Sequence, residues 1–395
     1  MKIKEQINAL KDELIKLRRD FHMHPELGFE VWRTAKVVAD YLEGLGLEVK
    51  SGIAKTGVVG LLRGKGHGRT ILLRADMDAL PIQEESEVSY KSVNDGQMHA
   101  CGHDGHMAML LVAAKVLSRL KDEINGNIKF LFQPNEENEG ARFMIEEGVM
   151  EAPHVDAALG LHLWAPLESG KMSITDGPVM GAGDIFKLTI KGKEGHTGFP
   201  QLAIDPIIAA ANVVTATQSI QTREVDPLNP VSIIFARIEG GTSLVNNIIP
   251  GKVELAGYIR HFREDGEEAR KMFKRIIDGV CRTYRTKYQL KITYGQPVLN
   301  NNPGMAELVR GVAGKLVSSP DDIVSGVRTI GGEDFSEFSQ RVPSIYYFIG
   351  TGNKEKETDF PHHYPKFNID EDTLATGAEM HVRTALAYFS AEGIQ

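Results

Sequence analysis

The sequence predicts an α/β fold with a mostly parallel sheet, into which a smaller α+β domain of ferredoxin-like order is inserted. Three observations indicate this. Over the first half of the chain, strand-length apolar runs alternate with helical patterns, which is typical of parallel sheets. Near Gly181 the order changes to strand, helix, strand, strand, helix, strand. From about Asn300 the first pattern resumes.

The first part of the chain supplies most of the predicted parallel sheet. The N-terminal residues carry apolar side chains at helical spacing, and a second helical pattern ends between Gly44 and Gly46. Short apolar strands bounded by turn residues then alternate with helices. The predicted elements are helices over 1–20, 30–45, 105–120 and 140–147, and strands over 57–62, 70–74, 128–132 and 155–161.

The middle of the chain is predicted to form its own domain. Its first helix has a clear start, with Asp205 as N-cap and Pro206 in the first turn. The elements here are strands over 186–191, 231–238, 253–261 and 290–294, and helices over 206–222 and 267–286. A helix over 305–317, a strand over 344–349 and a helix over 371–391 follow. We therefore predict a discontinuous domain of residues 1–181 and 297–395 around an inserted domain of residues 182–296.

The composition limits the classes of partner. A net charge of −8 without a clustered Lys/Arg run argues against nucleic acid. No apolar run approaches the length of a membrane span, and the charged N-terminal residues lack the apolar core of a signal peptide. Two cysteines, Cys101 and Cys281, exclude a disulfide scaffold in a chain of 395 residues. We therefore expect a cytoplasmic protein without nucleic-acid or membrane partners.

Residues that can bind metal or transfer protons follow three of the predicted strands. The carboxyl ends of parallel strands meet at one edge of a sheet, where ligands bind. The side chains at these ends are Asp76, Asp78, Glu136, Glu137 and His162, and further candidates are Cys101, His103 and one of His362 and His363. Thiolate, imidazole and carboxylate together suit zinc, manganese, cobalt or nickel, whereas calcium and magnesium prefer oxygen alone.

The pair Glu136–Glu137 suggests hydrolysis. Adjacent carboxylates on a turn cannot point the same way, so one can bind metal while the other deprotonates a metal-bound water. Asp76 and Asp78 would orient a ligand imidazole. An ordinary acidic surface turn is the plainer interpretation, and the nearby Glu139 favours it.

The other candidates also have plainer interpretations. Cys101 could be an inert buried thiol, or a nucleophile with His103 as its base. Side chains two residues apart in a Gly-containing turn rarely meet in that second geometry. His162 could be a hydrogen-bonded core histidine. Structural or supporting roles are predicted for His22, His24, His99 and His106.

Several motifs, occurring in order over nearly the whole chain, resemble those of one family. They are Arg18-Arg-Asp-Phe-His-Met-His-Pro-Glu26, Leu73-Arg-Ala-Asp-Met-Asp-Ala-Leu-Pro81, Met98-His-Ala-Cys-Gly-His-Asp104, Gln133-Pro-Asn-Glu-Glu137, Gly160-Leu-His-Leu163, Gly240-Gly-Thr242, Asn247-Ile-Ile-Pro250, Gly331-Gly-Glu-Asp-Phe335 and His363-Tyr-Pro-Lys-Phe-Asn-Ile-Asp-Glu371. The sequence resembles the metallo-amidohydrolase family of hippurate hydrolases, bacterial N-acyl-L-amino acid aminoacylases and auxin–amino acid conjugate hydrolases, in peptidase clan MH.

This resemblance implies a catalytic domain that holds two divalent metal ions, zinc first, with manganese, cobalt or nickel as alternatives. It also implies an inserted lid domain that can form a homodimer. The implied ligands are Cys101 as a bridge between the metals, His103 and His162 on one metal, and Glu137 and His363 on the other. Glu136 would be the general base and Asp78 would support the ligands. In the lid, Asn247 and Arg260 would hold the substrate carboxylate, and His196 would reach the reacting carbonyl, sometimes across a dimer.

The implied reaction is hydrolysis of the amide bond of a small N-acyl amino acid by metal-bound hydroxide. Hydrolysis of N-carbamoyl amino acids or dipeptides by the same site is the first alternative, and a non-catalytic binding protein on this fold is the second. Two stretches depart from the family pattern: Asn138-Glu139 follows the glutamate pair, and Thr197-Gly198-Phe199 follows His196. Neither removes a predicted ligand, and both lie where they would affect substrate choice.

Overall fold

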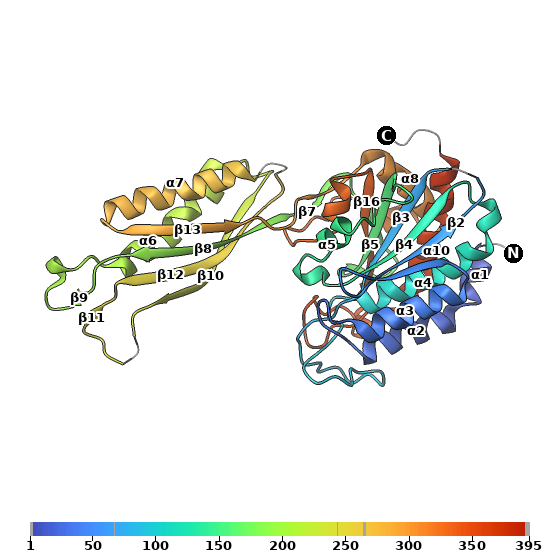
Figure 1. Cartoon of the computed structure of the whole chain (residues 1–395), viewed down its shortest axis with the longest axis horizontal. Coiled ribbons are helices and arrows are strands. Elements are labelled where there is room, and N and C mark those ends of the chain that lie inside the picture. Colours follow the sequence, from blue (N-terminus) through green and yellow to red (C-terminus); the bar gives the residue numbers. More distant parts are fainter. Residues whose placement is uncertain (1–2, 67, 243, 264–265, 392–395) are drawn as a thin grey trace. The chain divides into compact units, whose positions relative to one another are not determined.

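The computed structural model describes residues 3–66, 68–242, 244–263 and 266–391 (Figure 1). The chain divides into two compact units. The larger contains Met1–Val179, Leu299–Arg328 and Glu333–Gln395, and the smaller contains Met180–Val298 and Thr329–Gly332. The predicted fold class, a mostly parallel α/β sheet with an inserted ferredoxin-like domain, is confirmed.

An eight-stranded sheet forms the centre of the larger unit. Its strands are β1 Glu48–Ile53, β2 Gly57–Arg63, β3 Thr70–Asp76, β4 Asn127–Gln133, β5 Ala157–Glu168, β6 Met172–Ser173, β15 Ile323–Val324 and β16 Ser344–Gly352. Their order is β1-β2-β4-β3-β5-β16-β6-β15. The central strands β4, β3, β5 and β16 run parallel, and every residue of β3 is buried. A strand covered on both faces needs apolar side chains on both, which explains the continuous apolar run before Asp76.

Helices of the larger unit cover this sheet (Figure 1). They are α1 Ile3–Asn8, α2 Lys11–Met23, α3 Trp32–Gly44, α4 His103–Arg119, α5 Ala141–Glu146, α8 Pro303–Ala313, α9 Ser336–Ser339 and α10 Leu374–Ser390. Helix α4 packs against β3, α2 and α10, and most of its residues are buried because apolar side chains occupy nearly all its faces. The single helix predicted over 1–20 is instead two helices, since the chain turns at Ala9 and Leu10.

Strand β5 is longer than predicted. His162 was expected to follow the strand end, but it lies inside β5, opposite Phe348 of β16. The reason is that parallel pairing continues past it, with Leu163 opposite Ile349 and Trp164 opposite Gly350. The prediction placed the correct residue on the correct strand but ended that strand too early.

The smaller unit has the predicted strand and helix order. Its main elements are β8 Ala182–Lys191, α6 Pro206–Ser219, β10 Val231–Gly240, β12 Lys252–His261, α7 Glu267–Thr283 and β13 Lys287–Thr293. The antiparallel sheet order β10-β12-β8-β13 is the ferredoxin-like arrangement. Phe186 of β8, Val213 of α6 and Phe273 of α7 share its core. Helix α6 begins as predicted, because the Asp205 carboxylate accepts the Ile207 N–H at 2.8 Å.

Two short strand pairs complete the structure. In the smaller unit, β9 Gly195–His196 pairs with β11 Ile248–Ile249. A second pair joins β7 Gly177–Met180 to β14 Leu299–Asn301. These strands are too short to produce a recognisable sequence pattern, and none of them was predicted.

Residues 329–332 differ from the predicted domain division. They were assigned to the larger domain, but they belong to the smaller unit. The Gly181 N–H donates to the carbonyl oxygens of Thr329 and Gly331 at 3.0 and 2.9 Å. Backbone pairing between segments far apart in sequence thus decides where this segment belongs.

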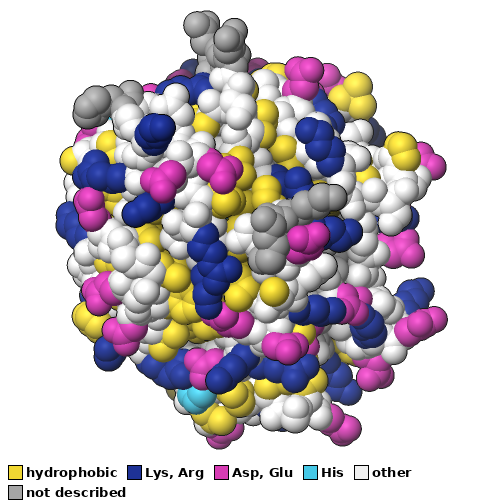
Figure 2. All heavy atoms as spheres, turned by 90° about the vertical axis from the view of Figure 1, so that its right-hand side faces the viewer, with side chains coloured by type: hydrophobic (Ala, Val, Ile, Leu, Met, Phe, Trp, Pro, Cys, Tyr) yellow, Lys and Arg dark blue, Asp and Glu magenta, His cyan; other side chains and the backbone are white. Residues whose placement is uncertain are grey.

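The surface is charged with both signs. On the face shown in Figure 2, basic and acidic side chains alternate, with apolar atoms between them. Within the described ranges, no helix combines the length and apolar character needed to cross a membrane.

Candidate metal centre

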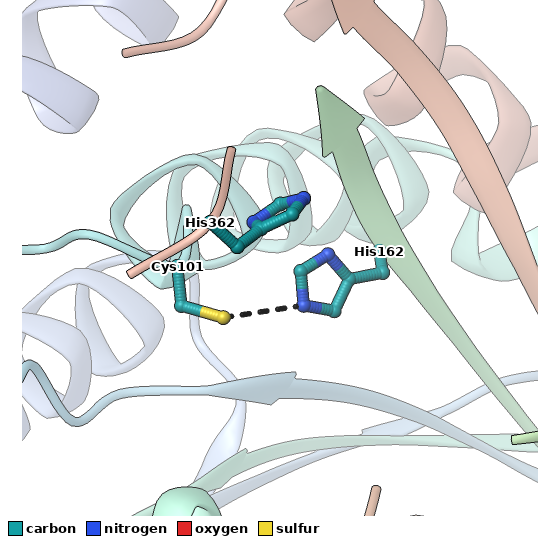
Figure 3. Close-up of side chains that lie close together, drawn as sticks. All are labelled: Cys101, His162 and His362. Carbon is teal, nitrogen blue, oxygen red and sulfur yellow. Dashed lines mark hydrogen bonds between the residues drawn. The ribbon is translucent and has the colours of Figure 1, made fainter. Parts of the chain in front are cut away.

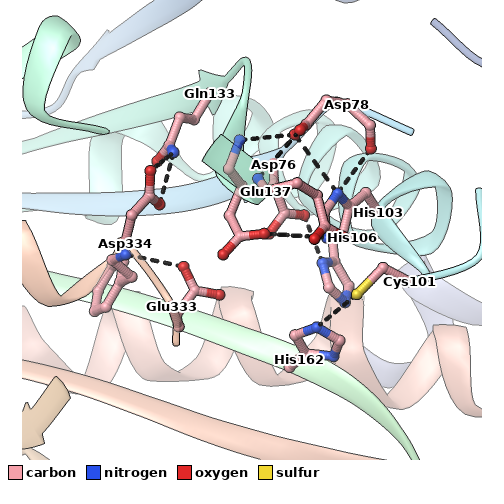
Figure 4. A network of polar contacts seen from close by, with 12 residues as sticks. Asp76, Asp78, Cys101, His103, His106, Gln133, Glu137, His162, Glu333 and Asp334 are labelled. Atoms are coloured by element: carbon pink, nitrogen blue, oxygen red, sulfur yellow. Dashed lines mark hydrogen bonds and ion pairs between the residues drawn. The ribbon is translucent and has the colours of Figure 1, made fainter. Parts of the chain in front are cut away.

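The predicted site residues of the larger unit converge at the carboxyl ends of β3 and β4 and beside the middle of β5, where His162 lies (Figure 4). Asp76 is the last residue of β3, and Glu136 and Glu137 form a 3₁₀ turn, η2 Glu136–Asn138, just after β4. Cys101 precedes α4, and His103 is its first residue. Parallel pairing of β3 with both β4 and β5 brings these segments together.

Cys101 is common to two groups of potential ligand atoms. In the first, atoms of Cys101, His103 and Glu137 lie within 4.8 Å of one another. In the second, Cys101 is joined by His162 and His362 (Figure 3). Its Sγ lies 3.5 Å from Nε2 of His162. A thiolate in this position can contact two metal ions at once, whereas the alternative nucleophile pair with His103 would leave the second group without a purpose.

The ring orientations of His103 and His162 suit metal binding. His103 donates its Nδ1–H to the carbonyl oxygen of Asp78 at 2.8 Å, and His162 donates its Nδ1–H to the carbonyl oxygen of Leu163 at 2.7 Å. Each ring therefore turns the lone pair of Nε2 toward Cys101 or Glu137. Nε2 of His103 is buried and has no hydrogen-bond partner among the described residues. A buried nitrogen without a partner is costly, and a metal ion would satisfy it.

The two adjacent histidines of the C-terminal loop differ in their contacts. Nε2 of His363 lies 3.3 Å from Oε1 of Glu137. Nε2 of His362 accepts the backbone N–H of Ala165 at 3.3 Å, which commits that nitrogen to the backbone. Between the two candidates left open by the spacing, the contacts favour His363 as the partner of Glu137.

Asp78 connects the glutamate turn to His103. Its carboxylate accepts the backbone N–H of Glu136 at 2.9 Å and that of Glu137 at 3.2 Å. Its backbone carbonyl oxygen accepts the Nδ1–H of His103. Asp78 therefore contacts the ring of His103, a predicted ligand, through its backbone, and the glutamate turn through its side chain.

Asp76 has a different role from the expected one. It was predicted to orient a ligand imidazole, but its Oδ1 accepts from Nδ1 of His106 at 2.6 Å. Nε2 of His106 accepts the N–H of Leu163 at 3.0 Å, so both nitrogens of that ring are used. Asp76, His103 and His106 also form a compact cluster, but the contacts of His106 and Asp76 leave them poorly available as ligands.

A buried ionic network surrounds Arg74 and was not predicted from the sequence. This side chain lies 2.6 Å from Oδ2 of Asp76, 3.0 Å from Glu333 and 2.9 Å from Asp334. Asp334 in turn accepts the N–H of Ala141 at 2.8 Å, which fixes the start of α5. A signal was present, because an arginine inside an apolar strand requires buried anionic partners.

The electrostatics of the site favour cations. Carboxylates here outnumber arginines: those of Asp76, Asp78, Glu333 and Asp334 are buried, and those of Glu136 and Glu137 are only slightly exposed. Burial and the neighbouring charge of Glu333 raise the pKa of Glu136 well above its ordinary value. Burial lowers the pKa of His162 well below its ordinary value, so its ring stays neutral, as a metal ligand must. The donor set and its charge therefore fit divalent metal ions.

The predicted substrate residues lie in the smaller unit and fall into two places. His196 of β9 is paired with Ile248, and the Thr197 N–H donates to the carbonyl oxygen of Asn247 at 3.0 Å. His196 and Asn247 are thus neighbours. Arg260 is distant from them. Lys252, the first residue of β12, closely follows β11, and Arg260 lies roughly 26 Å farther along the same strand.

Arg260 has contacts of its own. Its Nη1 donates to the carbonyl oxygen of Ile330 at 3.1 Å, and its guanidinium lies over the ring of Tyr258, 4.7 Å from the centroid. The structure therefore brings His196 and Asn247 together and separates Arg260 from both.

Comparison with known proteins identifies the family. The sequence profile of Peptidase family M20/M25/M40 matches residues 72–387. The chain is 40% identical over 393 residues to thermostable carboxypeptidase 2 of Saccharolobus solfataricus, covering 98% of both chains. It is 44% identical over 306 residues to the N-acyl-L-amino acid amidohydrolase of Geobacillus stearothermophilus, covering 76% of this chain and 82% of the relative.

A solved structure of similar fold is described as a metal-binding peptidase. The YXEP protein of Bacillus subtilis, described as a dinuclear metal binding peptidase from the M20 family, matches with a TM-score of 0.84 at 30% identity. The match covers 97% of this chain and 99% of that one. The resemblance read from the motifs is thereby confirmed. The chain belongs to Peptidase family M20/M25/M40, and it is a metallo-amidohydrolase of that family.

Proposed function

We propose that the protein hydrolyses the amide bond of N-acyl amino acids, releasing a carboxylate and a free amino acid. The observation that carries this proposal is the division of the glutamate pair. Glu137 groups with Cys101 and His103, whereas Glu136 groups with Glu333 and Asp334. One carboxylate thus faces the ligand atoms, and its neighbour is left for proton transfer.

Two divalent metal ions are the proposed cofactors. Cys101 would bridge them, His103 and His162 would hold one, and Glu137 and His363 the other. Zinc is the first expectation, and manganese, cobalt or nickel are the alternatives, because sulfur, nitrogen and oxygen donors occur together. When bound, such metals supply Lewis acidity, which lowers the pKa of water and polarises the amide carbonyl.

Glu136 is the proposed general base. The raised pKa of its carboxyl is the environment expected of a group that accepts a proton from water and returns it to the leaving amine. Asp78 would keep the carboxylate of Glu136 in place by holding the backbone of its turn. The proposed lid residues act on the substrate: His196 on the developing oxyanion, and Asn247 and Arg260 on the carboxylate of the amino acid.

The separation of the lid residues supports a homodimer. Asn247 and Arg260 lie near opposite ends of β12, so within a single lid domain they are too far apart to hold one small carboxylate together. A second copy of the chain would supply the missing residue. Strand β10 is an edge strand with exposed Ile234 and Ile238, and it is the proposed contact between lids.

Peptide hydrolysis at the carboxyl terminus is a second candidate, favoured by the 40% identity to a thermostable carboxypeptidase. It uses the same site, since the amide and the free carboxylate are shared by both substrates. N-carbamoyl amino acids and dipeptides are further variants of this chemistry.

The two cysteines are unpaired, which suits the proposed cytoplasmic location.

A substrate panel with one variant tests the proposal. Metal-reconstituted protein should release amine from N-acyl amino acids, and the rates on N-carbamoyl amino acids and peptides decide between the variants. Glu136→Gln should keep its metal but lose about a hundredfold or more in kcat. Glu147→Gln, an exposed change beyond the same turn, is the control. Full activity in Glu136→Gln would refute the assigned base.

A further inference from the structure

Arg18 of α2 is a fully buried arginine outside the metal centre. Its Nε lies 2.8 Å from Oδ2 of Asp104, and neither side chain is exposed to solvent. Asp104 occupies the first turn of α4, directly after His103. A buried guanidinium needs several anionic or polar partners at fixed positions, so this pair restricts where α4 can begin.

The same guanidinium also contacts the C-terminal loop. Nη2 donates to Oδ1 of Asn368 at 2.9 Å, and Nη1 lies 3.2 Å from Oε1 of Glu371. Arg19 adds a second contact to Glu371, at 2.6 Å. Arg18 therefore joins two segments far apart in sequence, one beginning at His103 and the other following His363.

His22, one turn later on α2, extends these contacts. Its Nδ1 lies 2.7 Å from Oδ2 of Asp104, and its Nε2 lies 3.3 Å from Oε1 of Glu84. The neighbouring Glu85 N–H donates to the carbonyl oxygen of Pro365 at 2.8 Å. The segment before Cys101 is thus fastened to the same helix and to the same C-terminal loop.

His363 needs such support because its backbone is strained. Its φ is 62°, in the left-handed region that residues other than glycine rarely adopt. Strained residues persist where the surrounding contacts over-determine the chain. The His363 N–H donates to the carbonyl oxygen of Ala100 at 2.8 Å, next to Cys101, and the Arg18 contacts at Asn368 and Glu371 hold the following residues.

We propose that Arg18, acting through Asp104 and Asn368, is a positioning residue that sets the spacing between Cys101–His103 and His363. This inference rests on the proposed metal centre. Loosening the C-terminal loop would allow His363 to move from Glu137 while His103 and His162 keep their places, because those two rings are fixed by backbone carbonyls. The expected consequence is selective: one metal ion is held more weakly and the other is not.

The test is titration of metal-free protein with Co²⁺, followed by absorbance of the thiolate–cobalt and ligand-field bands. Asn368→Ala removes the contact to the loop without leaving a buried charge unpaired, and Arg18→Lys keeps the charge but loses the fork of donors. Lys11→Met is the matched control, since Lys11 pairs with Asp372 between the same two segments but on the surface. All variants are also unfolded in urea.

The wild-type protein and the control should bind two Co²⁺ ions with unchanged affinity. Asn368→Ala and Arg18→Lys should bind one ion as before and the other about tenfold more weakly or worse. The inference would be overturned if both variants bound both ions with wild-type affinity. It would also be overturned if both sites weakened equally, in step with a general loss of stability. A wild-type protein that binds no second ion would instead refute the proposed dinuclear centre.

Discussion

The carboxylate of Asp78 accepts the backbone N–H of Glu136, with an N···O distance of 2.9 Å. The adjacent N–H of Glu137 reaches the other oxygen at 3.2 Å. One buried side chain thus fixes the backbone of both the proposed base and the proposed ligand. The hydrogen bonds need two acceptor oxygens, which only a carboxylate supplies at this position.

Asp78→Asn should therefore be impaired although it changes a single atom. The amide offers one acceptor oxygen, and its NH₂ group would face a backbone N–H. We expect kcat to fall about tenfold to a hundredfold with little change in the far-ultraviolet circular dichroism spectrum. Asp122→Asn, an exposed change of the same type, should match the wild type. An unchanged kcat in Asp78→Asn would show that the turn does not depend on this contact.

Removing the shared thiol should remove metal. Cys101→Ala should lose bound metal together with activity, as measured by elemental analysis and amine release, because both groups of ligand atoms include its sulfur. Chelation of the wild-type protein should abolish activity in the same way. Cys281→Ala changes the other cysteine, buried in α7, and should retain both metals. A Cys101→Ala protein that keeps two metals but is inactive would favour the nucleophile interpretation.

Complementation tests the proposed homodimer. His196→Ala and Arg260→Ala should each be nearly inactive alone, since each removes one contact to the substrate. After the two proteins are mixed under conditions that exchange subunits, activity should return, because a mixed dimer contains one site with every residue intact. Mixing His196→Ala with Asn247→Ala is the control. These two residues are neighbours and would reach a site from the same subunit, so every site in the mixed dimer would lack one of them and activity should not return. No recovery in the first mixture would contradict assembly across subunits.

Glu13 should make stability depend on acid pH. Burial alone would raise the pKa of its carboxyl, but hydrogen bonds from Lys115 and Tyr41 outweigh burial and lower it. A carboxyl whose pKa is lowered by folding stabilises the protein at pH values above its pKa in the unfolded chain, which is about 4.3. This stabilisation is lost as the pH falls through the pKa of the folded state.

Glu13→Gln should accordingly be less stable than the wild type at pH 7, by at most about 1 kcal/mol for a partly exposed pair. Urea unfolding midpoints should converge as pH is lowered below about 4.3. Glu123→Gln, at an exposed position, should show no such convergence, because its unfolding midpoint should differ little from that of the wild type at any pH. A difference that grows toward acid pH would contradict the assigned direction.

Local sequence patterns were sufficient for much of the fold. The order of strands and helices, the insertion after Gly181 and the start of α6 at Asp205 follow from apolar periodicity and capping, which act between residues close in sequence. The same holds for Asp76 and the glutamate pair, whose place at strand ends is a property of short segments. The extent of β5 beyond His162 is not local, because it depends on pairing with β16.

The sequence by itself determined which side chains could bind metal, since the thiol, imidazole and carboxylate groups sit in recognisable motifs. Only the tertiary structure decided how they are used. It placed Cys101 in both ligand groups, committed His106 to Asp76, and gave Arg74 and Arg18 their buried partners. Most of these contacts join segments far apart in sequence, as Arg74 and Asp334 do, and they depend on packing distances that no local pattern of residues encodes.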